Sequence, residues 1–288
     1  MSAKLIGLIA HSAKPGATAM VKELAAEFKK RGAALKFEEK TASLIGESHG
    51  VSTEQLGKTC DILLVLGGDG TILQVVHDLG ENLKPIFGIN LGSLGFLTCV
   101  NSSAYLKAVD SILARDYVLS QRTLLTVEVL RKGKTVCRLT GLNDAVISRG
   151  EHSRLIKLKT RIDNSVLTEY NADGLIVATA TGSTAYSLSA GGPILMPDSG
   201  VFVITPICPH VLTNRTVIVS DNSEIEVSPC HDQDEVFLAV DGHEPIAVKC
   251  SDTIRILKSN LSLPLAMLPG MSFSEVLRQK LKWSGSAV

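Results

Sequence analysis

The sequence of 288 residues lacks several features that mark common classes of protein. It carries no net charge, because 29 basic residues balance 29 acidic ones, so composition gives no reason to expect nucleic acid or an anionic membrane as a partner. No apolar run approaches the roughly 18 residues of a membrane-spanning helix. The six cysteines include no Cys-x-x-Cys pair, which argues against a zinc ribbon and, at this length, against a disulfide scaffold. We therefore expect a cytoplasmic protein with reduced thiols.

Familiar catalytic signatures are missing as well. Gly57-Lys58-Thr59 resembles the end of a P-loop, but Ser52 stands where that motif needs its first glycine. The dinucleotide fingerprint Gly-x-Gly-x-x-Gly fails at Gly68 and Gly70, because its third position is Leu73. There is neither a His-Glu-x-x-His nor a Gly-x-Ser-x-Gly motif. These absences argue against zinc hydrolases, α/β-hydrolases and ordinary dehydrogenases.

The length corresponds to roughly two domains, and 45% apolar residues suffice for a sizeable core in each. In the first 120 residues, apolar strand-like runs alternate with helical periodicity. This rhythm predicts an α/β domain with a parallel sheet and helices on its faces. We expect strands at 4–10, 34–38, 62–66 and 85–90, and helices at 18–31, after the capping box of Ser52 and Gln55, at 71–79 and at 104–114.

From about residue 117 the pattern changes to short alternating runs, which predicts a β-rich second domain. One expected strand, 156–162, presents Lys157, Lys159 and Arg161 on its outer face, either to solvent or to a neighbouring subunit. Residues 274–283 form an expected amphipathic helix, with Ser274 as its N-cap. We predict an α/β domain at 1–120, on which 265–288 pack back, and a β-rich domain at 121–264.

The segment Gly67-Gly68-Asp69-Gly70 follows an expected buried strand and precedes an expected helix. In an open α/β sheet this carboxyl end is where ligands bind, and the free N–H groups of a helix start attract phosphate oxygens. An aspartate there would repel a phosphate, so we expect Asp69 to face a hydroxyl, as acceptor or base, or a phosphate-bound metal. The alternative is a tight turn in which Asp69 only caps the helix.

Two further polar segments interrupt apolar strands. Between Asn171 and Pro193, hydroxyls at Thr181, Ser183 and Thr184 surround a glycine at an expected helix start, which favours polar ligand atoms over a plain surface helix. Asn143-Asp144 lies inside an apolar run, where such a pair most often marks a turn.

Together these residues resemble the bacterial-type NAD kinase family. The segment 67–70 looks like the GGDG motif of that family, Asn143-Asp144 like its Asn-Glu pair, and 173–193 like its long glycine-rich second motif. The stretch 88–97 and Pro209-His210 with Arg215 also match. The resemblance covers nearly the whole chain, and its second motif is highly specific.

The resemblance implies transfer of the terminal phosphoryl of ATP, or of polyphosphate, to the 2′-hydroxyl of the adenosine ribose of NAD. It implies that Asp69 is the base on that hydroxyl, and that the β-rich domain binds NAD and forms a homodimer or homotetramer in which a second subunit completes each site. Mg²⁺ is expected with the triphosphate, and the sequence names no protein ligand for it. The NAD-contact positions implied by alignment are Asp69, Gly70, Asn143, Asp144, Arg154, Asn171, Asp173, Thr181, Thr184, Ala185, Tyr186, Ser187, Leu188, Ser189 and His243.

The sequence departs from the family pattern in places. Asp144 stands where glutamate is usual, Asn171 replaces a commoner basic residue, and His243 a commoner glutamine. Ala180 replaces proline, and Gln74 replaces arginine. None of these changes removes a group that the reaction needs, so they bear on donor preference and affinity.

Two other functions fit parts of the sequence. Lipid and sphingoid-base kinases share a Gly-Gly-Asp-Gly-Thr motif, but the segment 181–193 and the lack of a lipid-sized apolar stretch count against them. A non-catalytic NAD sensor is the other alternative, and it would not need an aspartate rather than an asparagine at position 69.

Overall fold

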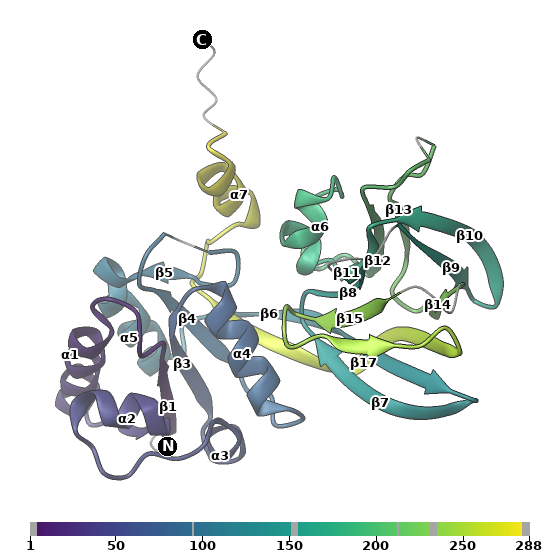
Figure 1. The fold of residues 1–288 in the computed structure, drawn as a ribbon. Coiled ribbons are helices and arrows are strands. Elements are labelled where there is room, and N and C mark those ends of the chain that lie inside the picture. Colours follow the sequence, from purple (N-terminus) through teal and green to yellow (C-terminus); the bar gives the residue numbers. More distant parts are fainter. Residues whose placement is uncertain (1–4, 94, 151–154, 212, 231–234, 284–288) are drawn as a thin grey trace. The chain divides into compact units, whose positions relative to one another are not determined.

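The structure is a computed structural model that describes residues 5–93, 95–150, 155–211, 213–230 and 235–283 (Figure 1). The chain divides into two compact units, described separately below. The N-terminal unit comprises Met1–Gln121 together with Leu263–Val288, and the β-rich unit comprises Arg122–Ser262. No helix within the described residues is both long and apolar enough to cross a membrane.

The N-terminal unit alternates strands and helices along the chain. Its strands β2, β1, β3 and β4 pair in that order, all parallel, and β4 also pairs in parallel with β5 and with residues 265–266 of β17. The elements are β1 (Leu5–Ala10), α1 (Ala17–Lys30), β2 (Ala34–Phe37), α2 (Glu39–Ile45), α3 (Thr53–Thr59), β3 (Ile62–Gly67), α4 (Asp69–Leu79), β4 (Ile86–Asn90), β5 (Val100–Asn101), a 3-10 turn (Ser102–Ala104), α5 (Tyr105–Ala114) and α7 (Phe273–Leu281).

Apolar periodicity explains this arrangement. Strand β3 is buried along its whole length, as expected for a central parallel strand with helices on both faces. On one face, Val21, Leu24 and Phe28 of α1 join buried residues of α5 and of β1, β3 and β4 in one core. The apolar stripe of α4 buries Ile72, among others. This packing fixes the carboxyl ends of β1 and β3. The GGDG segment begins at the carboxyl end of β3.

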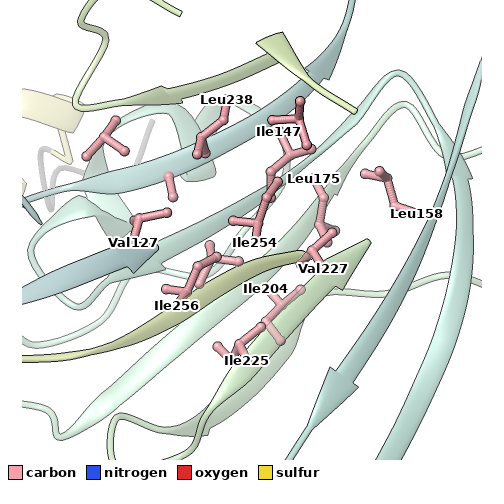
Figure 2. Packing of buried hydrophobic residues seen from close by; sticks show 14 of the residues in the cluster. Val127, Ile147, Leu158, Leu175, Ile204, Ile225, Val227, Leu238, Ile254 and Ile256 are labelled. Atoms are coloured by element: carbon pink, nitrogen blue, oxygen red, sulfur yellow. The ribbon is translucent and has the colours of Figure 1, made fainter. Parts of the chain in front are cut away.

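The β-rich unit contains a six-stranded antiparallel sheet in the order β13-β12-β11-β8-β15-β16. A second set of strands, β6, β7, β9, β10, β14 and β17, contributes the rest of its core, and Figure 2 shows the interlocking aliphatic side chains. The elements are β6 (Val118–Arg131), β7 (Lys134–Gly141), β8 (Asp144–Arg149), β9 (Ile156–Ile162), β10 (Ser165–Ala172), β11 (Gly174–Thr179), a 3-10 turn (Gly182–Thr184), α6 (Tyr186–Ser189), β12 (Val201–Ile207), β13 (Val217–Ser220), β14 (Ile225–Pro229), β15 (Val236–Val240), β16 (Ile246–Val248) and β17 (Asp252–Met267).

The predicted fold class is confirmed: an α/β N-terminal part with parallel strands, a β-rich part and a C-terminal helix. Two local predictions are wrong. The GGDG segment is not a separate turn, because α4 already begins at Asp69. The C-terminal helix is capped by Ser272 rather than Ser274, since Glu275 completes a capping box with Ser272. This helix does return to the N-terminal unit, where the Phe273 ring lies 6.1 Å from that of Phe96.

Candidate active site

Asp69 is the first residue of α4, with Gly68 as the N-cap. Its carboxylate reaches across to the loop after β4, where the backbone N–H of Phe96 donates to Oδ2 (2.9 Å) and that of Leu97 donates to Oδ1 (3.0 Å). Gly95 is essential to this contact, because a Cβ built on it would lie 1.9 Å from Oδ1 of Asp69. Two backbone donors and one glycine therefore fix where the carboxylate points.

A cavity of about 460 Å³ lies beside this segment, entirely within the N-terminal unit. Gly68, Gly70 and Thr71 line it at the start of α4. The N–H of Gly68 donates to the Thr71 hydroxyl at 3.3 Å and that of Thr71 to the Gly68 carbonyl at 3.0 Å, so the N–H groups of Asp69 and Gly70 are the ones that the first helical turn leaves for a ligand. Lys14 and Lys40 supply positive charge to the cavity from the segments that follow β1 and β2. Two carboxylates, Glu38 and Asp78, belong to the same lining, and the carboxylate of Glu38 accepts the N–H groups of Lys40 and Thr41. The remaining lining residues are Ile9, Ala10, His11, Ser12, Thr53, Gln74 and Val75. Helix N–H groups and lysines together suit an anion such as a phosphate chain.

A second polar cluster lies in the β-rich unit, at the edge where β11 and β15 end and β8 begins. Asp144 opens β8 opposite Ala178 and is only 4% exposed. Burial, and secondly the charge of the neighbouring Asp241, raise the pKa of Asp144 to about 7. The preceding residue, Asn143, accepts the backbone N–H of Thr179 through its carbonyl at 2.8 Å. Asp144 is therefore the first residue of an inner strand, and Asn143 is the residue before it.

The segment 180–190 packs against this edge and runs back along β11 as the 3-10 turn and α6. Gly182 approaches the chain so closely that a Cβ on it would lie 2.0 Å from the carbonyl oxygen of Asn143. The hydroxyl of Ser183 is held inside the fold, donating to the carbonyl of Ala180 at 2.7 Å. In contrast, Oγ1 of Thr181 is buried and has no hydrogen-bond partner within the described part of the chain. The Thr184 hydroxyl donates to the carbonyl of Thr181 at 3.2 Å, so of the three hydroxyls at 181, 183 and 184 that of Thr181 is the one without a partner among the described residues.

Other predicted contact residues follow along the same segment. Ser187 is buried, and its hydroxyl pairs with that of Thr205 at 3.0 Å, so it supports the fold. Tyr186 is 47% exposed, and Ser189 is exposed as well. Three positions are intermediate in exposure: Thr184, Ala185 and Leu188.

Asp173 lies at the opposite end of β11 from Asn143 and Asp144. Its carboxylate Oδ1 accepts a hydrogen bond from Nε of Arg149 at 2.7 Å. Both residues line a hollow of about 390 Å³ with Ser148, Gly150, Tyr186 and Ile207. Six residues of β11 separate the two groups, a span of about 20 Å at roughly 3.3 Å per residue. One chain therefore does not bring Asp173 together with the Asn143–Asp144 pair.

Three predicted residues remain. Asn171 lies in β10, next to the Asp173 end, and its carbonyl accepts the N–H of His210 at 2.9 Å. His243 follows β15 across a tight turn and lies on the chain segment that carries Asp241. Arg154 falls outside the described residues.

Sequence reasoning missed Asp241, whose carboxylate accepts three backbone N–H groups of residues 142–144. The available signal was Asp241-Gly242 directly after an apolar strand, which resembles the Asp69-Gly70 pair after β3, although β15 is buried only at alternate residues. It also missed Lys14 and Lys40, which nothing in their local sequence distinguishes from solvated lysines. Among the described residues, no group of three or more His, Cys, Asp or Glu side chains gathers to hold a metal ion.

Two family models match the chain, and together they cover most of it. Residues 6–117 match the ATP-NAD kinase N-terminal domain, and residues 142–268 match the ATP-NAD kinase C-terminal domain. The chain belongs to the ATP-NAD kinase family. Among curated relatives, the NAD kinase of Solibacter usitatus is 40% identical over 280 residues, covering 97% of this chain and 98% of that protein. The NAD kinase of Geobacter sulfurreducens is 38% identical, covering 97% and 99%.

Solved structures of the family share the fold. Yeast NADH kinase complexed with NADH superimposes with a TM-score of 0.88 at 25% identity, covering 99% of this chain and 89% of that one. An NAD kinase from Archaeoglobus fulgidus in complex with ATP gives a TM-score of 0.76 at 23% identity, covering 98% and 100%. Family membership confirms the resemblance seen in the motifs and disfavours the lipid kinase alternative.

Proposed function

We propose that this protein is an NAD kinase, which transfers the terminal phosphoryl group of ATP to the 2′-hydroxyl of the adenosine ribose of NAD and releases NADP and ADP. One observation carries the assignment in this chain. A carboxylate fixed by two backbone N–H groups stands at the head of α4, beside a lysine-lined cavity. A carboxylate at that position can take the proton of an acceptor hydroxyl, and the cavity can hold the phosphates of the donor.

Asp69 acts as the general base. The 2′-oxygen attacks the terminal phosphorus, the bond from phosphorus to the bridging oxygen of ADP breaks, and the hydroxyl proton passes to the carboxylate of Asp69. A carboxylate offers about four lone-pair sites, and the N–H groups of Phe96 and Leu97 use two. A positioned base of this kind contributes roughly 10²–10⁴-fold to the rate.

The cavity beside Gly68 and Gly70 holds the donor. Lys14 and Lys40 balance the charge of the phosphates, and the N–H groups at the start of α4 donate to the terminal phosphate oxygens. Mg²⁺ is expected to arrive with ATP as part of the substrate, because it commonly binds through phosphates and one or two carboxylates. Polyphosphate is an alternative donor with the same chemistry.

The acceptor NAD is bound by the group formed by Asn143, Asp144 and Thr181, with His243 next to it, while Tyr186 faces the hollow at the Asp173 end of β11. The available hydroxyl of Thr181 supports this placement, because a buried polar atom without a partner is costly unless a ligand completes it. The other NAD-contact positions implied by the family motifs belong to the same proposal: Gly70, Arg154, Asn171, Thr184, Ala185, Ser187, Leu188 and Ser189.

A second subunit completes each site in this proposal, as a homodimer or homotetramer. The separation of Asp173 from Asp144 along β11 supports it, because a carboxylate at the far end of the strand is better placed for the NAD of a neighbour. Light scattering at micromolar concentration is expected to give a dimer or tetramer. A strictly monomeric and fully active protein would contradict the proposal.

Subunit mixing tests the role of Asp173 more sharply. Asp69→Asn and Asp173→Asn chains are each expected to be nearly inactive as homo-oligomers. Each mixed dimer has one intact site, built from the Asp69 of one chain and the Asp173 of the other. Because about half of the dimers in an equimolar mixture are mixed, the mixture is expected to recover about a quarter of wild-type activity. No recovery after verified subunit exchange would mean that Asp173 serves its own chain.

The function itself is tested by incubating the purified protein with NAD, ATP and Mg²⁺, with diacylglycerol as a parallel acceptor. NADP formation is expected, with no transfer to the lipid. Binding of NAD without NADP formation from ATP or polyphosphate would favour the sensor alternative instead. The cytoplasmic location expected from the sequence is part of this proposal.

A further inference from the structure

Asp241 makes an unusual set of contacts just after β15. Its Oδ2 accepts the backbone N–H of Leu142 at 2.7 Å, and its Oδ1 accepts those of Asn143 (2.7 Å) and Asp144 (3.1 Å). In return, its own N–H donates to the carbonyl of Asp144 at 3.0 Å. One side chain therefore holds three consecutive residues of the segment that opens β8.

The backbone of Asp241 is held in the left-handed region, with φ at 53°, and Gly242 follows with φ at 73°. Few residues adopt this conformation easily, and aspartate is among those that tolerate it. The tight turn directs the carboxylate from the end of β15 toward the neighbouring segment 142–144, at the start of β8. The three charge-assisted hydrogen bonds to residues 142–144 offset the energetic cost of this backbone conformation.

We propose that Asp241 is a positioning residue for the NAD acceptor, which sets the orientation of Asn143 and Asp144 by binding their backbone. This inference rests on the proposed function, in which those two residues contact NAD. Asp241 needs no contact with the substrate to act in this way. It fixes the backbone from which both contacting side chains extend.

The contacts explain why an aspartate is needed rather than an asparagine. A carboxylate only accepts hydrogen bonds, so both of its oxygens can face N–H groups. In asparagine one of these positions becomes an NH₂ group, which would face an N–H of residues 142–144 donor to donor. The exchange keeps the volume of the side chain but breaks at least one of the three bonds.

The charge of Asp241 also shifts the pKa of Asp144, which a contact that only holds the backbone would not do. The pKa of Asp144 is raised to about 7 first by burial and then by the charge of Asp241. Burial also raises the pKa of Asp241, while its three N–H donors and His243 oppose that rise. Asp241 is thus the charged group acting on Asp144, and His243 acts on Asp241. Removing the charge of Asp241 is expected to lower the pKa of Asp144.

The experiment compares Asp241→Asn with Thr179→Val in steady-state assays from pH 5.5 to 9. Thr179→Val loosens the same segment without a change of charge, because the Thr179 hydroxyl donates to the carbonyl of Leu142 at 2.6 Å. Asp241→Asn is expected to raise KM for NAD about 10-fold or more, with little change in KM for ATP. It is also expected to move the midpoint of the pH dependence of KM for NAD downward, which Thr179→Val does not.

The outcomes are distinct. An active wild type with an unchanged KM for NAD in Asp241→Asn overturns the inference, and so does a parallel rise in both KM values with an unmoved midpoint. A wild type that makes no NADP overturns the proposed function instead. Should Asp241→Asn fail to fold by circular dichroism, Asp241→Glu replaces it, because it keeps the charge and displaces the carboxylate from the N–H groups of residues 142–144. A rise in KM for NAD with little change in KM for ATP in Asp241→Glu supports the inference, and an unchanged KM for NAD overturns it.

Discussion

Replacing Asp144 by asparagine is expected to make the protein more stable at neutral and alkaline pH. The folded carboxyl has a pKa raised to about 7, against 3.8 for its ordinary value, because it is 4% exposed and lies near Asp241. Below pH 4 the carboxyl is protonated in both the folded and the unfolded chain. Between about pH 4 and 7 the unfolded chain ionises while the folded one stays protonated, so stability is lost as pH rises.

The magnitude follows from the difference between the two pKa values. Roughly three units at about 1.4 kcal/mol each give up to about 4 kcal/mol of destabilisation at pH 8 from this one carboxyl. Because an asparagine stays neutral, the Asp144→Asn variant does not lose this free energy of unfolding at high pH. At pH 4, where the wild type has lost little, the two proteins should differ little. The side chain is too deeply buried for solvent screening to reduce the effect greatly.

Urea unfolding at pH 4.5 and pH 8, followed by circular dichroism at fixed protein concentration, measures this difference. The midpoint for Asp144→Asn is expected to exceed that of the wild type clearly at pH 8 and only slightly at pH 4.5, with similar slopes. Glu81→Gln is the control, because Glu81 is exposed, and it should follow the wild type. Parallel midpoints for wild type and Asp144→Asn at both pH values would refute the reasoning.

Three further predictions concern catalysis. Gly95→Ala would place a Cβ 1.9 Å from Oδ1 of Asp69 and displace the base, so kcat should fall about 100-fold; an unchanged kcat in the folded variant would mean that the Asp69 geometry is unimportant. Asn143→Ala is expected to raise KM for NAD about 10-fold with a smaller effect on KM for ATP, and an unchanged KM for NAD would return residues 143–144 to the role of an ordinary turn. Lys14→Ala and Lys40→Ala should each raise KM for ATP about 10-fold; Lys58→Ala, at an exposed lysine of α3 paired with Glu54, is the control, and equal effects of all three would argue against the cavity as donor site.

The fold could be predicted from local periodicity wherever strands and helices alternate regularly. Strands β1, β3 and β4 and helices α1 and α5 lie within one or two residues of their expected positions. Helix α2 was missed because Glu38 caps it, accepting the N–H groups of Lys40 and Thr41, and glutamate is not among the usual N-cap residues. The start of α4 was missed because a glycine-rich segment favours a turn, whereas Thr71 accepts the N–H of Gly68 and begins the helix earlier.

The site was predictable in its residue types but not in its geometry. Asp69 stood out because it follows a buried strand, yet its donors, Phe96 and Leu97, lie 27 and 28 residues further on. Asp241 escaped notice because its partners lie 97 to 99 residues away, and only the antiparallel pairing of β8 with β15 brings them together. Contacts of this range depend on strand register, which local patterns do not specify.

The rate of NADP formation by Asp69→Asn tests the central claim most directly. Asparagine keeps the size of the side chain but cannot take the proton of the ribose hydroxyl. We expect kcat to fall about 100-fold or more, while the dissociation constant for NAD, measured by calorimetry, changes only a few-fold. A kcat that stays within a few-fold of wild type in the folded variant would contradict the assignment of Asp69 as the base.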